Sequence, residues 1–212
     1  MHIPDGFLSP QITLPAYAVS APLWAWAARR HFGHAAVESL PVVGSLTAVA
    51  FVIQTIMIPV PGGTSTHLLG VTLLALLYHP LVAFLCESLV LLVQALFFGA
   101  GGITVLGVNA LAMGLLGPLA GWLAWRALRR LHEGAAAFAA AYVAMQVSTL
   151  VVVAALALQH ALSERYFPVP VAVVLPAMML PSLTAAGLAE GAYTVLALSL
   201  LRKANLRGVA MG

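Results

Sequence analysis

Charge is scarce in this sequence: only 7% of the 212 residues are Asp, Glu, Lys or Arg, whereas 62% are hydrophobic. A soluble domain carries about 25% charged residues, and a soluble fold of this size has too small an interior to bury so much apolar surface. The hydrocarbon core of a membrane is the solvent that this composition fits. The sequence therefore predicts an all-α integral membrane protein, with a single transmembrane domain over residues 1–212, contact with membrane lipid and no nucleic-acid partner.

Other absences narrow the chemistry. The one cysteine, Cys86, cannot form an internal disulfide, and a thiolate metal cluster is excluded. The first ten residues contain no Lys or Arg, so the basic region of a signal peptide is missing. We therefore expect the N-terminus to be mature as written, and Met1 to keep its free amine because the bulky His2 prevents its removal. The only lysine is Lys203, and the pattern G-x-x-x-x-G-K-[ST] is absent, so ATP binding by that route is not expected.

Long apolar stretches predict about seven transmembrane helices, since a spanning helix needs roughly 20 apolar residues. They cover 12–28, 40–58, 68–78, the run from Pro80 to 98, 107–125, 135–160 and 182–201. The third stretch would rise only about 16 Å, so the outer loop before it, 59–67, is expected to re-enter the membrane inside a protein-lined cavity. The apolar segment 169–180 contains two prolines, and whether it also re-enters the membrane is left open.

Basic residues predict the orientation of these helices. Eight of the nine Lys and Arg residues follow the first, fifth and last helices, and only Arg165 lies on the opposite side. The positive-inside rule makes the basic side cytoplasmic, and all four tryptophans fall at the same boundary, as an aromatic belt does. The N-terminus and residues 1–10, 59–67 and 99–106 are therefore expected outside, and the C-terminus inside. The basic residues are Arg29, Arg30, Arg126, Arg129, Arg130, Arg202, Lys203 and Arg207, and the tryptophans are Trp24, Trp26, Trp122 and Trp125.

The first two residues form a potential metal chelator. The amine of Met1, the backbone nitrogen of His2 and its imidazole can bind one ion together, closing a five-membered and a six-membered ring. The amide must lose its proton, which Ni(II) and Cu(II) favour in tetragonal nitrogen fields. A fourth nitrogen is needed, and His67 is the histidine expected in a polar, inward-dipping outer loop. The segments 1–10 and 59–67 are therefore predicted to form the metal site, with Met1, His2 and His67 as ligands.

Further polar residues are candidates for supporting this site. Asp5 belongs to a Pro-Asp-Gly turn that would fold the terminus back onto the helices. Ser65 is expected to orient His67. Asn109, at the start of the fifth helix, either hydrogen-bonds the terminal segment or caps the helix. Glu87 and Glu190 lie in apolar helices, where ionisable residues are costly and often functional; Glu190 is expected to bond neighbouring parts of the bundle, and Glu87 to face its interior.

Several motifs together resemble one known family. They are M-H-I-P-D-G-F-L at 1–8, S-T-H at 65–67, G-G-I-T-V-L-G-V-N-A-L-A-M-G at 101–114 and L-A-E-G-A-Y-T at 188–194. In order and spacing the chain resembles the nickel/cobalt substrate-capture subunits of energy-coupling factor transporters, the CbiM/NikM family. It departs from the family pattern at Pro4-Asp5, where Met-Glu is frequent, and at Leu68-Leu69, where the loop often reads P-T-G.

The resemblance implies that Ni(II) or Co(II) is a transported substrate held by Met1, His2 and His67, and that the chain is a transport subunit of a prokaryotic inner membrane and not an enzyme. It also implies a link to cobalamin biosynthesis. The implied partners are a transmembrane coupling subunit, a cytoplasmic ATPase pair and a small accessory membrane subunit. The alternative is an ion-gradient-coupled secondary metal transporter that uses Glu87 and Glu190 without an ATPase. A metal sensor is a further alternative, and the choice between nickel and cobalt is left open.

Overall fold

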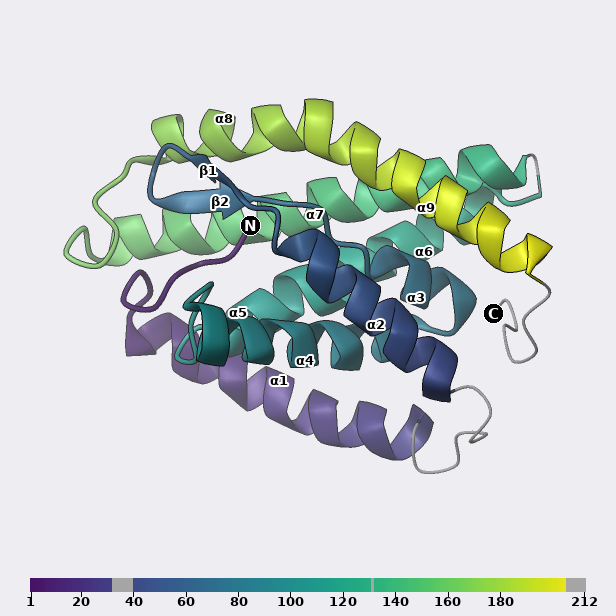
Figure 1. The fold of residues 1–212 in the computed structure, drawn as a ribbon. Helices are drawn as coiled ribbons and strands as arrows, with labels where there is room; N and C mark the ends of the chain where they lie inside the picture. Colours follow the sequence, from purple (N-terminus) through teal and green to yellow (C-terminus); the bar gives the residue numbers. More distant parts are fainter. Residues whose placement is uncertain (32–39, 131, 205–212) are drawn as a thin grey trace.

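The computed structural model describes residues 1–31, 40–130 and 132–204, and these are mostly helical (Figure 1). The first helices along the chain are α1 (Pro10–His31), α2 (Leu40–Gln54), α3 (Thr72–Leu77) and α4 (Pro80–Phe98). The helices α5 (Leu106–Asn109) and α6 (Gly117–Leu128) are joined without a break by the π-helical segment η2 (Ala110–Leu116). The long helix α7 (Glu133–Leu162) is followed by α8 (Val171–Pro181), which continues through η3 (Ser182–Ala186) into α9 (Gly187–Lys203).

Four of the described helices are long and apolar enough to cross a membrane. They are Pro80–Phe98, Leu106–Leu128, Glu133–Leu162 and Val171–Lys203. The apolar α2 has 15 residues, and α1, with 22 residues, contains Pro15 and Pro22. A multi-helix membrane protein is thus confirmed, whereas the number of crossings contributed by α1, α2 and the short α3 stays a prediction.

The last helix begins earlier than expected. Residues 169–180 were predicted to lie outside the last helix, but Val171–Lys203 forms one helix of 33 residues. Pro181 cannot donate a backbone hydrogen bond, yet the helix passes it by widening into the π-helical turn η3, where Thr184 leaves the helical conformation at φ −110° and ψ −106°. A π-helical turn absorbs such a defect, and the kink at Thr184 separates α8 from α9 within this continuous run, so the predicted boundary near residue 181 is kept as a kink and not as a loop.

The region around His67 is less helical than the sequence suggested. The second helix ends at Gln54 and not at residue 58, because residues 58–66 form a small antiparallel hairpin of β1 (Ile58–Val60) and β2 (Thr64–Thr66). The third helix spans only Thr72–Leu77 instead of 68–78, and all its residues are buried. Residues 67–71 are therefore irregular backbone where the start of the third helix was expected, and the predicted re-entry of the loop 59–67 into the membrane stays a prediction.

Small residues bring α6 and α7 close together. A Cβ atom added at Gly117 would lie 1.9 Å from the Ser148 hydroxyl oxygen, and one added at Gly121 would lie 2.5 Å from the Ala140 carbonyl oxygen. Such distances leave no space for a side chain, so the G-x-x-x-G spacing serves packing inside this chain.

Replacing Gly121 by Ala is expected to destabilise the protein by about 1–3 kcal/mol, because the added methyl group overpacks the contact between α6 and α7. Thermal unfolding in detergent measures the effect as a lower midpoint. Gly44→Ala is the matched control, since nothing lies within 4 Å of its added Cβ and alanine favours the helix by about 1 kcal/mol. Equal midpoints for the two variants would contradict the packing argument.

Basic helix ends gather at one end of the bundle (Figure 1). His31, at the end of α1, stacks on His79 at a ring distance of 4.8 Å, and His79 lies 5.9 Å from the ring of Trp122 in α6. Arg202 at the end of α9 pairs with Glu133 at the start of α7. This clustering supports the predicted cytoplasmic side, although Arg207 lies outside the described residues.

Candidate metal centre

The N-terminal segment turns back and enters the bundle. The Phe7 N–H donates to the Pro4 carbonyl at 3.3 Å, and Gly6 takes φ 85°, as the Pro-Asp-Gly sequence predicted. The chain then places its first three residues in the interior: Met1, His2 and Ile3 are 1%, 2% and 0% exposed. The terminal amine is therefore a buried group of the core and not a free surface end.

Two side chains, those of Asn109 and Asp5, anchor this segment to α5 and to the residues just before α5. Asn109 accepts a hydrogen bond from the Ile3 N–H and donates one to the Ile3 carbonyl, both at 3.1 Å. Asp5 accepts hydrogen bonds from the N–H groups of Ile103 at 3.1 Å and Thr104 at 2.9 Å. A Cβ at Gly102 would lie 2.0 Å from the Asp5 carboxylate, so this approach requires glycine there. The N-terminal segment therefore packs against the glycine-rich residues 101–109.

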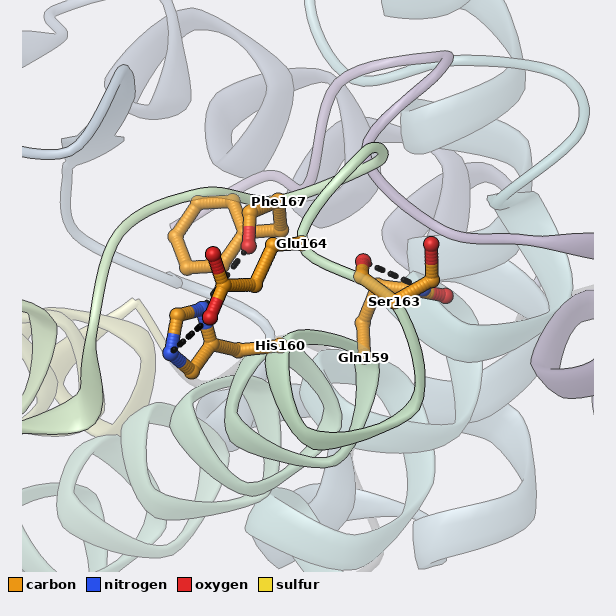
Figure 2. Close-up of polar contacts among 5 residues, drawn as sticks. All are labelled: Gln159, His160, Ser163, Glu164 and Phe167. Atoms are coloured by element: carbon orange, nitrogen blue, oxygen red, sulfur yellow. Dashed lines mark hydrogen bonds and ion pairs between the residues drawn. The ribbon is translucent and has the colours of Figure 1, made fainter.

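The C-terminal end of α7 holds the segment from the other side. The Ser9 N–H donates to the Gln159 side-chain oxygen at 2.6 Å, and the ring of Phe7 lies 5.5 Å from that of Phe167. Figure 2 shows His160 pointing to the backbone of Phe167, at 3.0 Å, and to the carboxylate of Glu164, at 3.9 Å. His160 therefore holds the loop that contains Phe167, against which Phe7 packs. It is not one of the two buried histidines, His2 and His67, described next.

His2 and His67 meet in the interior. Their rings stack at a centroid distance of 4.4 Å and an interplanar angle of 24°, and His67 is 3% exposed. The His67 Nδ1 lies 2.7 Å from the Leu68 carbonyl oxygen. Since a carbonyl only accepts, Nδ1 carries the proton and the Nε2 lone pair is free. His67 Nε2 and both ring nitrogens of His2 are buried without a hydrogen-bond partner, which is unusual for buried polar atoms.

Burial disfavours the charged forms of these groups. Desolvation lowers the pKa of the Met1 amine well below its usual value, although the charge of Glu87 opposes this change. Desolvation, together with the charge of the amine, lowers the pKa of His2 to about 3 and that of His67 well below its usual value. Neutral nitrogens have available lone pairs, which is the form that binds a metal.

The nitrogens that could bind a metal here are the Met1 amine, the His2 amide and the two imidazoles. Four nitrogens suit a square-planar or tetragonal Ni(II) or Cu(II) ion. Within the described residues, no group of three or more His, Cys, Asp or Glu side chains forms a metal site. This absence fits a site whose other two donors are the terminal amine and a backbone nitrogen, which are not side-chain groups.

Sequence reasoning missed two neighbours of the site. Gln94 of α4 is fully buried, and its amide nitrogen and oxygen form no hydrogen bond; it lies beside His2 and partly offsets the fall in the pKa of that ring. Thr149 of α7 donates to the Met1 sulfur at 2.8 Å. Both are polar residues in mainly apolar helices, which is the only signal the sequence offers. Ser65 lies 3.9 Å from the Met57 sulfur, and its role beside His67 stays a prediction.

Other described histidines have structural roles. His79 and His132 accept hydrogen bonds through Nδ1 from the N–H groups of Leu81, at 3.1 Å, and Ala135, at 3.0 Å. Each caps the helix that follows it. With Nδ1 used as an acceptor, the neutral rings carry their proton on Nε2, so they are not arranged as metal ligands. His34 lies outside the described residues.

Substitution of Asn109 by Ala is expected to weaken metal binding about 10- to 100-fold, the range seen when residues that hold metal ligands are removed. The Ile3 N–H and carbonyl would stay buried without partners, at a cost of about 1–3 kcal/mol each, and the terminal segment would shift. Titration of the purified variant with Ni(II) measures the affinity. Ser163→Ala, at the C-terminal end of α7, is the control and should bind Ni(II) as the wild type does. If Asn109→Ala also binds Ni(II) with wild-type affinity, Asn109 does not support the site.

Comparison with known proteins adds a family. The model described as "Cobalt uptake substrate-specific transmembrane region" matches residues 2–207. A putative metal transport protein of Methanocaldococcus jannaschii is 36% identical over 205 residues, covering 96% of this chain and 92% of that protein. A probable fused nickel transport protein of Lactiplantibacillus plantarum is 34% identical over 217 residues, covering 96% and 65%. The cobalt transport protein CbiM of Geobacter sulfurreducens is 36% identical over 199 residues, covering 92% and 57%. The chain thus spans nearly all of the first protein and less than two thirds of the other two.

Solved structures agree with the fold. A crystal structure described as a truncated transition metal transporter superposes with a TM-score of 0.92 at 34% identity, covering 96% of this chain and 99% of that one. A second, described as a transition metal transporter, gives 0.91 at 34% identity, covering 97% and 94%. The similarity therefore extends over almost the whole described fold.

Proposed function

The chain belongs to the CbiM family, the substrate-specific transmembrane region of cobalt uptake, and from this premise we propose that it captures Ni(II) or Co(II) for uptake across a prokaryotic inner membrane. The family predicted from the motifs is thereby confirmed. Its relatives are named as nickel, cobalt or metal transport proteins. Transport, and not catalysis, is the activity that these names share.

One observation carries the proposed site: the buried His2 and His67 rings stack with three ring nitrogens unpartnered, and Met1 is buried with them. We propose that Met1, His2 and His67 hold the metal, with the His2 amide nitrogen as the remaining donor. His67 would bind through Nε2, because its Nδ1 proton is used by Leu68. His2 would bind through Nδ1, since that atom closes the six-membered ring with its own amide. Asp5 and Asn109 would hold the segment in place, and Ser65 would assist His67.

Energy for uptake must come from outside this chain if it works as an energy-coupling factor transporter, because no ATP-binding pattern of the Walker type occurs in its sequence. The proposed partners are a transmembrane coupling subunit, a cytoplasmic ATPase pair and a small accessory membrane subunit. The gathering of basic helix ends on one side of the bundle supports an orientation in which the metal site opens outward and the basic end faces the cytoplasm.

A second candidate is an ion-gradient-coupled transporter. One observation favours it: Glu87 is fully buried in α4 and one of its carboxylate oxygens, Oε1, has no hydrogen-bond partner. Buried carboxylates of this kind occur in proton and ion relays of secondary transporters.

Metal content and uptake distinguish these functions. The protein purified from cells supplied with both metals is expected to retain about one Ni(II) or Co(II) per chain, measured by elemental analysis. Cells that produce this chain alone are expected to accumulate little radioactive nickel, and cells that also produce the partner subunits much more. Accumulation by the chain alone that stops when the ion gradient is dissipated would instead favour the second candidate. A purified protein without affinity for either metal would contradict both.

A further inference from the structure

A buried polar cluster lies among the helices near the proposed metal site and is not part of the donor set. It consists of Gln54 of α2, Glu87 of α4 and Glu190 of α9, each 0% exposed. Ionisable and strongly polar side chains inside apolar helices are costly to bury. The contacts of this cluster indicate what offsets that cost.

Glu190 is bound to the loop that carries His67. Its two carboxylate oxygens accept hydrogen bonds from the N–H groups of Leu69 and Gly70, both at 2.9 Å. Gly70 takes φ 71°, and a Cβ added there would lie 3.1 Å from the Ala50 backbone of α2. The loop is thus held tightly between α9 and α2 directly after His67.

Gln54 binds the same loop from the opposite side. Its side-chain nitrogen donates to the Leu69 carbonyl at 2.8 Å and to the Glu87 carboxylate at 2.7 Å. The Leu69 backbone is therefore fixed at its N–H by α9 and at its carbonyl by α2.

A single peptide unit connects Glu190 to His67. The Leu69 N–H that donates to Glu190 and the Leu68 carbonyl that accepts from His67 Nδ1 belong to the same planar group. Carboxylate, peptide and imidazole therefore form a continuous chain of hydrogen bonds in which each bond polarises the next. A carboxylate that bonds a ligating histidine directly fixes the ring and strengthens its donor nitrogen; here a peptide lies between the two.

We propose that Glu190, with Gln54 holding the same loop, positions His67 as a metal ligand through the peptide that joins Leu68 and Leu69. The carboxylate of α9 sets the plane of that peptide, and the peptide sets the direction of the His67 ring. This inference rests on the proposed function, because it assigns a role toward a metal that His67 is proposed to bind.

Glu190→Gln tests whether Glu190 positions His67 through the peptide that joins Leu68 and Leu69. The amide keeps the size of the side chain but has one acceptor oxygen in place of two, so it cannot accept from both Leu69 and Gly70 with separate oxygens. The purified variant is expected to bind Ni(II) about 10- to 100-fold more weakly. Its visible absorption spectrum is expected to shift toward that of His67→Ala, whereas Glu190→Asp, which keeps the carboxylate, is expected to recover part of the wild-type affinity and spectrum.

Thr194→Val is the matched control, because Thr194 is buried one turn further along α9 and its hydroxyl has no hydrogen-bond partner. It is expected to leave the spectrum of bound Ni(II) unchanged. Weaker binding by Glu190→Gln with a wild-type spectrum would show a general structural effect and overturn the proposal, as would unchanged affinity.

Two further outcomes separate the possible failures. If the wild-type protein binds neither Ni(II) nor Co(II), the proposed function itself is wrong. If Glu190→Gln is not recovered folded, Gln54→Met decides the question, since it releases the Leu69 carbonyl from α2. A shifted spectrum in that variant supports the proposal, and a wild-type spectrum overturns it.

Discussion

Two alanines added before Met1 are expected to abolish Ni(II) binding by the purified protein, with the affinity falling more than about 100-fold; a single added residue is unsuitable, because a free amine two residues before a histidine is itself a four-nitrogen Ni(II) chelator. The addition converts the Met1 amine into an amide, so that its lone pair is no longer a simple donor and a five-membered chelate ring is lost. Removal of a ligand should exceed the 10- to 100-fold effects seen for residues that only support ligands. Because Met1 is 1% exposed, the two added alanines must also displace the N-terminal segment from its packed position.

The measurement is titration of the metal-free proteins with Ni(II), followed by absorption and by elemental analysis of the bound metal. The protein with the same two alanines placed after Gly212 is the control and should bind Ni(II) as the wild type does. Stoichiometric binding by the N-terminally extended protein would show that the terminal amine is not a ligand.

His2→Ala is expected to have an effect of similar size. The substitution removes an imidazole donor and the six-membered chelate ring, and the affinity should again fall more than about 100-fold. It also removes the ring that stacks on His67 at 4.4 Å. Loss of the visible absorption band and of retained nickel measures the change.

His160→Ala is the matched control for this histidine. His160 bonds the Phe167 carbonyl and approaches Glu164 at the C-terminal end of α7 (Figure 2). His160→Ala is expected to lower the thermal stability of the protein modestly and to leave the absorption spectrum of bound Ni(II) as in the wild type. If His2→Ala retains nickel as well as His160→Ala does, the ion is bound elsewhere.

The ligands and their supports were predictable from the sequence to different degrees. Met1 and His2 are adjacent in the chain, so their chelating geometry depends on local covalent structure alone. The Pro-Asp-Gly turn is also local, since it depends on φ preferences, and the structure contains it. Asn109 was left between two roles, because a helix-capping residue and a residue that bonds a distant segment look alike in one sequence; the structure brings it 3.1 Å from Ile3, 106 positions away.

The position of Gln94 beside His2 and the hydrogen-bond partners of Glu190 could not be predicted either, because these contacts also join residues that are distant in the sequence. Gln94 is one polar residue in an apolar helix, and nothing in its neighbours indicates that His2 packs beside it. Glu190 was expected to bond other parts of the bundle, but only the fold shows that its partners are Leu69 and Gly70, about 120 positions earlier. The error at residues 169–180 has a different cause: proline predicts a helix break, whereas packing and a π-helical turn carry this helix past Pro181.

The scarcity of charge and the long apolar stretches were sufficient to predict a helical membrane protein, because the cost of burying charge in hydrocarbon depends on composition and not on the fold. The sequence was also sufficient to propose a chelating N-terminus, whose donors are joined by covalent bonds. Only the tertiary structure decided that this terminus is buried, that His67 stacks on His2, and that Glu190 holds the His67 loop. Those contacts join residues far apart in the chain, and their free energies depend on how the helices pack.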